Sequence, residues 1–208
     1  MVGRALAAKL DQLGHEVTVG ARSAESESLK VFLGMGSVKT GSFADAARAA
    51  ELVINATGGL NSLAALSQVG AGDLDGKPLL DVANMLEPQE GGPPKPVASV
   101  DNCLAVAIQQ AYPAAKVVKS LNTMNCNVMV DPSLVEGDHV VFVSGDDDGA
   151  KAAVVGLLKE FGWRDEQILD LGGIESAAGA EMIMPLWLSV MFARGGFDAG
   201  PFNFAVNS

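Results

Sequence analysis

Residues 1–26 read MVGRALAAKLDQLGHEVTVGARSAES, and this stretch decides how the chain folds. Its first 13 residues place valine and leucine at helical spacing, which predicts an amphipathic helix. Gly14 is expected to end that helix, because glycine adopts the left-handed conformation of a helix C-terminus at little cost. The alternating segment His15–Val19 then predicts a β-strand, followed by a turn that carries Arg22. The chain therefore opens on a helix that runs into a strand.

The rest of the chain continues this alternation of strands and helices. Strands are expected at residues 15–19, 38–40, 51–59, 77–84, 115–122, 139–145 and 167–173, and helices at 1–13, 24–33, 42–50, 61–69, 100–111, 147–161 and 175–193. Such alternation is typical of parallel strands with helices on both faces. We predict an α/β fold with a doubly wound parallel sheet. Residues 1–113 are expected to form a nucleotide-binding domain, and residues 114–208 a smaller C-terminal α/β part for substrate binding and dimerisation.

Composition excludes several classes of partner. The formal net charge is −11 and no cluster of lysine and arginine occurs, so neither nucleic acid nor an anionic membrane is an expected partner. The two cysteines, Cys103 and Cys126, have no metal-site spacing and form no disulfide framework, which predicts a reducing, cytoplasmic location. The most apolar stretch, residues 182–193, has twelve residues and contains Pro185. We interpret it as a buried helix or a dimer surface, too short for a membrane span.

Small polar residues follow four of the predicted strands. Ligands of open parallel sheets bind beyond the carboxyl ends of the strands, so these turns are expected to face one crevice. They are the segments 20–23 (GARS), 55–59 (NATGG) and 122–125 (NTMN), together with Asn84. Glycine-bearing turns of this kind suit a dinucleotide.

Arg22 is the most informative residue of these turns. Enzymes that use NAD usually carry an acid at the end of this strand, which binds the ribose 2′-hydroxyl, whereas enzymes for NADP accommodate the 2′-phosphate with a cation. Here the acid is absent, and Arg22 and Ser23 offer a guanidinium and a hydroxyl. Arginine binds phosphate through a bidentate fork, so this turn favours NADP. The alternative is a solvated arginine in a surface turn.

Gly3 has the position expected for the third glycine of a G-x-G-x-x-G dinucleotide fingerprint. In that fingerprint the glycines join the first strand to the first helix and let the pyrophosphate approach. The first strand and the first two glycines would lie before Met1. We therefore expect a Rossmann-type sheet whose first strand and first glycines are missing from this sequence, as an internal start codon would produce. The alternative is that Gly3 is an ordinary helix glycine.

Several segments together resemble the NADPH-dependent coenzyme F420 reductases, also called F420H2:NADP oxidoreductases. They are MVGRALAAKL, LGHEVTVGARS, ELVINATGG, LLDVAN, VVKSLNTMN, VFVSGDD, IESAAGAEMIMPLWL and the final FNF, and they run in the expected order over nearly the whole chain. The resemblance implies an oxidoreductase that transfers a hydride between NADP(H) and a deazaflavin coenzyme, F420, or a similar small acceptor. It implies no covalent step and no metal, so no catalytic side chain is expected.

The resemblance also implies roles for particular residues of this chain. Val2 and Gly3 would lie under the pyrophosphate, and Ala21, Arg22 and Ser23 would hold the 2′-phosphate end. The remaining residues of the implied site are Ala56, Thr57 and Gly58, along the path to the nicotinamide ribose, and Asn122, Thr123 and Met124, near the nicotinamide and the partner ring. A homodimer is also expected.

Three alternatives remain open at this stage. The protein could reduce another acceptor, such as a flavin, an imine or a ferric complex. It could instead be a regulator that binds NADP(H) without turnover. A sheet that lacks a central strand leaves two neighbours with unpaired backbone groups, so the chain as written could also fail to bind the cofactor.

Overall fold

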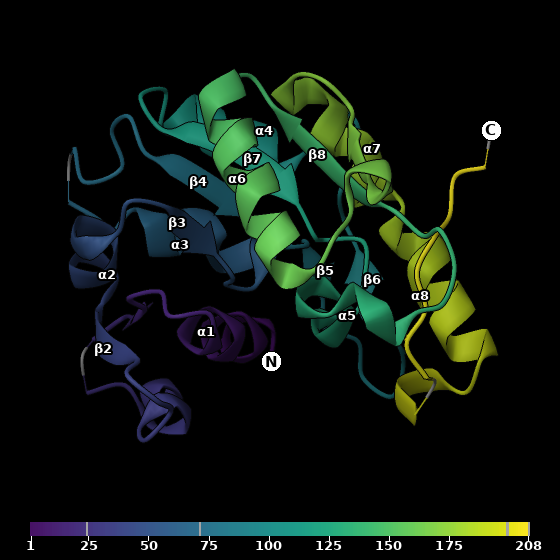
Figure 1. Ribbon diagram of the computed structural model, residues 1–208, viewed down its shortest axis with the longest axis horizontal. Coiled ribbons are helices and arrows are strands. Elements are labelled where there is room, and N and C mark those ends of the chain that lie inside the picture. Colours follow the sequence, from purple (N-terminus) through teal and green to yellow (C-terminus); the bar gives the residue numbers. More distant parts are fainter. Residues whose placement is uncertain (24, 71, 199, 208) are drawn as a thin grey trace.

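The computed structural model describes residues 1–23, 25–70, 72–198 and 200–207, and its strands form a main sheet and two small ones (Figure 1). The main sheet has the strand order β3-β4-β7-β8-β9, and β1 pairs with β2 in a separate sheet. The strands are β1 (Thr18–Ala21), β2 (Lys39–Ser42), β3 (Val53–Asn55), β4 (Pro78–Asp81), β5 (Leu86–Glu87), β6 (Lys95–Pro96), β7 (Lys116–Ser120), β8 (Val141–Gly145) and β9 (Ile168–Asp170).

Helices cover both faces of the main sheet. In Figure 1, α6 lies in front of β4 and β7, and α4 lies behind them. The helices are α1 (Val2–Gln12), α2 (Phe43–Ala49), α3 (Ser62–Leu66), α4 (Leu104–Ala111), α5 (Cys126–Val130), α6 (Asp148–Phe161), α7 (Ala177–Met182) and α8 (Met184–Ala193). The short 3₁₀ helices are η1 (Glu27–Phe32), η2 (Gly59–Asn61), η3 (Pro132–Leu134), η4 (Asp165–Gln167), η5 (Ile174–Ser176) and η6 (Gly196–Asp198).

The sheet is mostly parallel, which confirms the predicted α/β class. β3, β4 and β7 run parallel, and so do β8 and β9. β8 pairs with β7 in the antiparallel sense, so the expectation of a wholly parallel sheet is wrong at this one junction. The chain between β7 and β8 contains only the short α5 and η3, and strand–helix alternation does not fix the direction in which such a connection returns.

The hydrophobic core lies on both faces of β4 and β7. Leu80 and Val118 pack into one cluster with residues of α1, α5 and α6, and Leu79 and Val117 pack into another with α4. All four strand residues are almost completely buried. Burial on both faces requires apolar side chains at consecutive positions, which explains the runs LLDV and VVKS in the sequence.

The predicted ends of α1 and α2 are confirmed. Gly14 has φ 87°, and the His15 N–H donates to the Leu10 carbonyl oxygen, as in a Schellman ending. Ser42 caps α2 in a capping box with Asp45, where each side chain binds the other residue's backbone N–H.

Local predictions were less accurate around β1. The strand expected at His15–Val19 forms later, at Thr18–Ala21, and the helix expected at 24–33 is the 3₁₀ helix η1 over its described part. Residues 85–96, which lie between the elements expected at 77–84 and 100–111, contain the short antiparallel pair β5 and β6. The helix α5 had not been predicted, because its five residues are too few to show a helical period.

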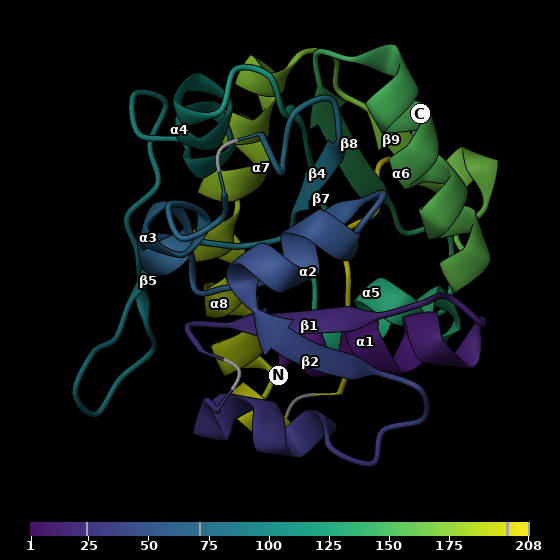
Figure 2. The ribbon, with the colours of Figure 1, turned by 90° about the vertical axis from the view of Figure 1, so that its left-hand side faces the viewer.

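A gap separates β1 from β3. Figure 2 shows β1 and β2 with α1 as a unit below β4 and β7, and none of the described residues forms a strand that joins the two sheets. Helices of both faces nevertheless continue across this gap, because α1 packs on α5 and α2 packs on β1.

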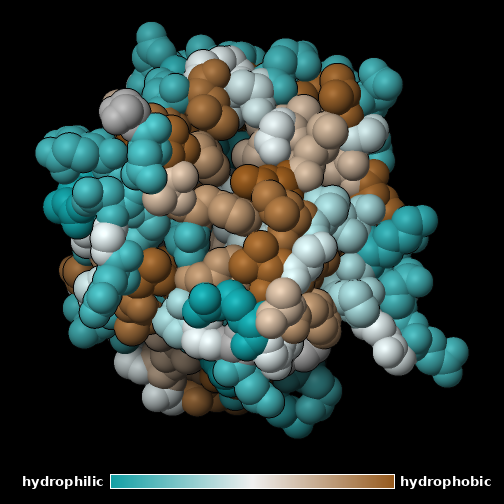
Figure 3. Space-filling view, turned by 90° about the vertical axis from the view of Figure 1, so that its right-hand side faces the viewer, coloured by the Kyte–Doolittle hydropathy of each residue, from teal (hydrophilic) through white to brown (hydrophobic). Residues whose placement is uncertain are grey.

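The apolar segment near the C-terminus is longer than the twelve residues considered in the sequence. η5, α7 and α8 form a helical run, Ile174–Ala193, of 20 residues with a mean hydropathy of 1.3. Length and composition would allow it to cross a membrane, but 44% of its most apolar window is buried in this structure, and core helices of soluble proteins have the same properties. Figure 3 shows apolar surface on the face that carries α8 and the C-terminal segment.

Candidate nucleotide-binding edge

The carboxyl ends of β4 and β7 are joined by a pair of asparagines. The Asn84 side chain donates from Nδ2 to the Asn122 carbonyl oxygen at 2.7 Å, and Asn122 Nδ2 lies 3.0 Å from Asn84 Oδ1. Asn122 also donates to the carbonyl oxygen of Ala180 in α7. These bonds fix two turns that the sequence had assigned to one ligand edge, and so confirm that the turns lie together.

The turn after β3 is fixed by side chains of its own. The Thr57 hydroxyl lies 2.6 Å from Asn55 Oδ1 and 2.9 Å from the hydroxyl of Ser62, the first residue of α3. Asn55 and Ser62 are buried, whereas Ala56 and Thr57 remain partly exposed. The turn therefore leaves the Ala56 methyl group and the Thr57 hydroxyl partly exposed on a backbone that these hydrogen bonds hold in place.

Gly59 brings this turn against the turn after β4. Its N–H donates to the Asn84 carbonyl oxygen at 3.1 Å, and a Cβ atom at this position would lie only 2.5 Å from the Asn84 carbonyl. Backbone lies against backbone here, so only glycine fits. The sequence analysis had selected the neighbouring Gly58, where a Cβ would meet nothing closer than 3.8 Å.

Leu121 holds the turn after β7 in an unusual backbone conformation. Its φ is 63°, the one positive φ of a non-glycine residue in the described ranges 1–23, 25–70, 72–198 and 200–207, and its side chain is buried. A branched residue in the left-handed region costs free energy and persists where the surroundings enforce it, often at functional sites. Burial of Leu121 and the hydrogen bonds of Asn122 supply that constraint.

A buried ion cluster lies beneath these three turns. Lys119 Nζ lies 2.7 Å from Asp81 Oδ2 and 3.0 Å from Glu181 Oε1, and all three side chains are fully buried. Asp81 accepts from Asn55 Nδ2 at 2.7 Å, and Asn55 in turn binds Thr57. A continuous polar chain therefore connects the core to the partly exposed turn after β3.

Glu181 extends the cluster to α4. Its carboxylate accepts from the backbone N–H groups of Leu104 and Ala105 and from the Cys103 thiol. The first N–H groups of a helix lack partners within it, so a buried carboxylate at this position satisfies them. Glu181 thereby joins the apolar run of α7 and α8 to the sheet. This agrees with the interpretation of that run as a buried helix.

The cluster keeps Lys119 protonated. Burial alone would lower the pKa of Lys119, but the carboxylates of Asp81 and Glu181 outweigh it and raise that pKa above its ordinary value. Burial raises the pKa of the Cys103 thiol to about 11, so Cys103 remains a protonated donor rather than a reactive thiolate.

A cavity of about 1550 Å³ opens between β1 and β3, beside these turns. Five predicted site residues line it: Gly3, Ala21, Arg22, Ala56 and Thr57. Arg22 is exposed, and no described residue forms a salt bridge with it. A Cβ atom on Gly3 would lie 3.6 Å from the Ala56 Cβ, an ordinary contact, so packing alone does not require glycine there.

The other predicted site residues lie around this cavity without lining it. Ser23 is exposed, and its N–H donates to Ser26. Thr123 and Met124, which follow Asn122 in the chain, are buried. The remaining four are Val2, which packs against the core, the exposed Gly58, the partly buried Asn84 and the buried Asn122.

Sequence reasoning missed Gly59, Arg4, Leu121 and the ion cluster. Arg4, in the first turn of α1, lines the cavity with Arg22. A signal for the cluster was present, since Asp81 and Lys119 follow the apolar pairs Leu79–Leu80 and Val117–Val118 with opposite charges. Nothing in the sequence indicated the positive φ of Leu121.

The fold is that of a Rossmann-type oxidoreductase. The family model for NADP oxidoreductases, coenzyme F420-dependent, matches residues 1–85. The chain is 45% identical, with a TM-score of 0.90, to the crystal structure of a candidate F420-dependent NADP-reductase from Arthrobacter sp. FB24; the match covers 100% of this chain and 95% of that one. The chain belongs to the family of F420-dependent NADP oxidoreductases, and is an NADP-dependent enzyme.

More distant structures share the fold. An imine reductase from Streptomyces aurantiacus is 17% identical with a TM-score of 0.64, and the match covers 93% of this chain and 59% of that one. A reductive aminase from Aspergillus terreus, solved with NADPH and ethyl levulinate, is 18% identical with a TM-score of 0.65, covering 92% and 59%. The curated proteins contain no match.

Replacing Gly59 by alanine tests the contact between the turns after β3 and β4. The new methyl group meets backbone atoms at 2.5 Å, so we expect Gly59→Ala to lower the free energy of unfolding by about 1–3 kcal/mol and to weaken NADPH binding. Chemical denaturation and calorimetry measure both effects. Gly58→Ala is the matched control and should change little; equal effects of the two would contradict the account.

Replacing Lys119 by methionine tests the ion cluster. Two buried carboxylates lose their cation, so we expect the free energy of unfolding to fall by about 3–5 kcal/mol. Lys116→Met is the control on the same strand, because Lys116 forms an exposed ion pair with Asp147, and exposed pairs contribute about 0–1 kcal/mol. Similar losses for the two variants would show that the cluster is not a special constraint.

Proposed function

We propose that the protein transfers a hydride between NADP(H) and the deazaflavin coenzyme F420 at the carboxyl edge of its sheet. The observation that carries this proposal is Arg22, exposed at the mouth of the cavity after β1 with no acid beside it on that strand. A guanidinium there matches a 2′-phosphate. Membership of the family and the candidate F420-dependent NADP-reductase from Arthrobacter support the choice of partner.

The phosphate end of the cofactor would be held by the start of α1 and by two arginines. The first backbone N–H groups of a helix point away from it unpaired, and the helix dipole favours an anion. Gly3 and Arg4 lie in the first turn of α1, and both line the cavity with Arg22. These donors fit the anionic groups of a dinucleotide.

The reactive end would lie at the turns after β3, β4 and β7. When bound, the nicotinamide supplies or accepts the hydride, so the protein's part is to orient two rings and to exclude water. The Thr57 hydroxyl and the Asn84–Asn122 pair are fixed by hydrogen bonds, and Thr123 and Met124, which follow Asn122 in the chain, are buried. A rigid edge of this kind would orient the two rings, and the hydride transfer would need no general acid or base.

Enzyme assays test the proposed acceptor. Oxidation of NADPH with F420 should proceed, as should the reverse reaction with reduced F420 and NADP⁺. The same assay with a flavin, a cyclic imine and a ferric complex tests the second candidate activity, which is favoured by the fold shared with imine reductases. NADPH binding without turnover of any acceptor would instead indicate a regulator.

Replacing Arg22 by alanine tests the cofactor preference. Loss of a charged phosphate contact should raise the Kd for NADPH at least tenfold, or about 1.4 kcal/mol, and leave the Kd for NADH within twofold. Titration calorimetry measures both constants. Arg48→Ala is the control, because Arg48 is an exposed arginine paired with Asp45 and Asp73. Equal losses for NADPH and NADH would contradict the assigned role of Arg22.

We also propose that the protein is a cytoplasmic homodimer. Leu186 of α8 and Met182 of α7 are large apolar side chains that are 54% and 43% exposed, which supports association through this helical run. Both cysteines are free thiols, which supports a reducing compartment. Light scattering coupled to gel filtration should give twice the 21.4 kDa chain mass, and Leu186→Glu should reduce it to one. A monomeric parent protein would contradict the dimer.

A further inference from the structure

The Thr57 hydroxyl, on the turn after β3, binds an asparagine whose orientation is fixed from the core. Asn55 lies 2.6 Å from Thr57 Oγ1 through Oδ1, and 2.7 Å from the buried Asp81 through Nδ2. Asp81 Oδ1 also accepts from the Ala83 N–H, and its other oxygen accepts from Lys119. Since Asp81 accepts in all these contacts, it takes the NH₂ side of the Asn55 amide.

A second contact fixes the Asn55 amide in the same orientation. The backbone N–H of Thr57 points at Asn55 Oδ1 at 3.3 Å, and a backbone N–H can only donate. Turning the amide over would place two donors against each other at Thr57 and two acceptors against each other at Asp81. Asn55 is 4% exposed, so water cannot relieve either contact. Asn55 Oδ1 therefore faces Thr57 as an acceptor.

The directions of the remaining hydrogen bonds follow from a count of protons. Because Asn55 Oδ1 cannot donate, the one hydroxyl proton of Thr57 goes to it. The two protons of Asn55 Nδ2 go to Asp81 and to the hydroxyl of Ser62, which lies at 2.9 Å. Ser62 Oγ also lies 2.9 Å from Thr57 Oγ1, and since the Thr57 proton is already used, Ser62 is the donor. Thr57 Oγ1 keeps a single free lone pair and has no proton to give.

That lone pair is what the Thr57 hydroxyl offers to a ligand. Thr57 is partly exposed and lines the cavity, whereas Ser62 is fully buried. Lys119 offers a ligand nothing, because its three Nζ protons go to Asp81, Glu181 and the Ala83 carbonyl oxygen. A phosphate oxygen on Thr57 Oγ1 would meet an acceptor with no proton between them, whereas a hydroxyl or an amide N–H would be bound.

We propose that Thr57 is an acceptor-only contact for the nicotinamide half of the cofactor, which binds a ribose hydroxyl or the carboxamide N–H and rejects phosphate. Asp81 and Asn55 set this polarity, because they fix where the Thr57 proton points, and the ion pair with Lys119 holds Asp81 in place. Resting on the proposed function, this role makes Thr57 a specificity-determining residue and not only a support of its own turn.

Replacing Thr57 by valine tests this role, because valine has nearly the same shape and no acceptor. The Kd for NADPH should rise roughly fivefold or more, since a donor of the bound cofactor loses its partner. The Kd for adenosine 2′,5′-bisphosphate, which has phosphates but no nicotinamide half, should stay within about twofold. A support of the turn alone would not separate the two ligands. Titration calorimetry measures both constants.

Two further variants serve as controls. Thr57→Ser keeps the hydroxyl and should bring the Kd for NADPH back to within about threefold of that of the parent protein. Thr18→Val removes a hydroxyl from the same cavity wall, at the start of β1 and away from the turns at the carboxyl ends of the strands. It should leave both constants unchanged.

An analogue of NADPH in which an acetyl group replaces the carboxamide identifies the donor. The analogue keeps the ribose hydroxyls and lacks the amide N–H. If Thr57→Val weakens binding of the analogue as much as binding of NADPH, a ribose hydroxyl is the donor. If the effect of Thr57→Val disappears with the analogue, the carboxamide is the donor. Either result supports the proposed contact.

Two outcomes of the titrations would overturn this contact alone. One is a change of less than about twofold in the Kd for NADPH on replacing Thr57 by valine; the other is an equal loss for adenosine 2′,5′-bisphosphate. Absence of NADPH binding by the parent protein would overturn the proposed function as well. None of the titrations needs turnover, so failure of hydride transfer to F420 and failure of this contact are separate results.

If Thr57→Val does not fold, NMR of the parent protein with bound NADPH and carbon-13 in the threonine methyl groups decides. Thr57→Ser lacks the methyl group and so assigns its signal. NOEs from the Thr57 methyl group to protons of the nicotinamide ribose or the carboxamide would support the proposal. NOEs to the adenine ribose, or none to the bound cofactor, would overturn it.

Discussion

One buried lysine organises the sheet edge on which the proposed function depends. Lys119 on β7 lies between Asp81 on β4 and Glu181 on α7, and the two carboxylates bind Asn55 and the start of α4. Charges without water are costly unless each has a partner, so these elements can pack in only one register. The register of these strands fixes the positions of the turns that follow β3, β4 and β7, which explains why the polar residues of those turns meet.

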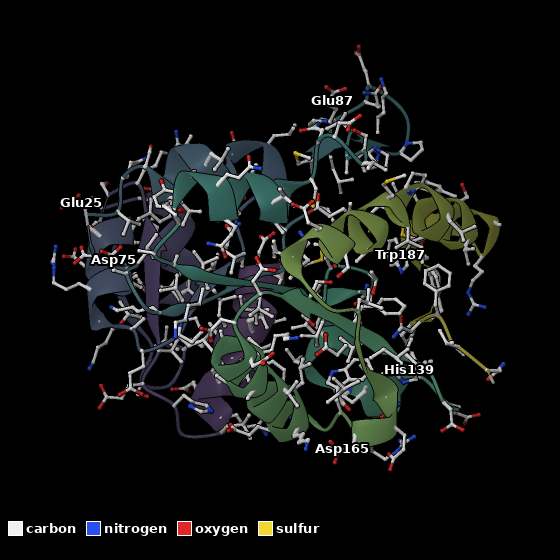
Figure 4. The ribbon with its side chains drawn as sticks, turned by 90° about the horizontal axis from the view of Figure 1, so that it is seen from above. Glu25, Asp75, Glu87, His139, Asp165 and Trp187 are labelled. Carbon is white, nitrogen blue, oxygen red and sulfur yellow. The ribbon has the colours of Figure 1, made fainter. Side chains whose placement is uncertain are left out.

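The edge is rigid where it would meet a nicotinamide and open where it would meet phosphates. Asparagine pairing, the close approach at Gly59 and the strained Leu121 fix the first part. Arg4, in the first turn of α1, and Arg22, after β1, line the cavity at the other part. Trp187 of α8 and His139 beside β8 lie at the end of the molecule away from Glu25 and Asp75 (Figure 4), and His139 is held by Pro132 and Asn203. That end serves packing and, as we propose, association.

The sequence was a reliable guide to elements with strong periodicity and to residues at strand ends. α1, α2 and α6, and the meeting of the turns that carry Asn84 and Asn122 at one edge, followed from pattern alone. The antiparallel β8, the 3₁₀ form of η1 and the short α5 did not, because they depend on tertiary packing rather than on local preference. Lys119 was visible as a charge within an apolar strand, but its partner Glu181 lies 62 positions away in sequence, and only folding brings them together. β1 and β3 belong to separate sheets, a division that strand–helix alternation did not indicate.

The central claim is that two rings exchange a hydride directly at this edge. NADPH carrying deuterium at the transferred position of the nicotinamide, incubated with the protein and oxidised F420 in ordinary water, tests it by mass spectrometry of the reduced acceptor. The account predicts that one deuterium atom appears in reduced F420, because no protein group takes up the hydrogen in between. Reduced F420 that contains only hydrogen from water would contradict direct transfer and require an intermediate carrier that the described structure does not provide.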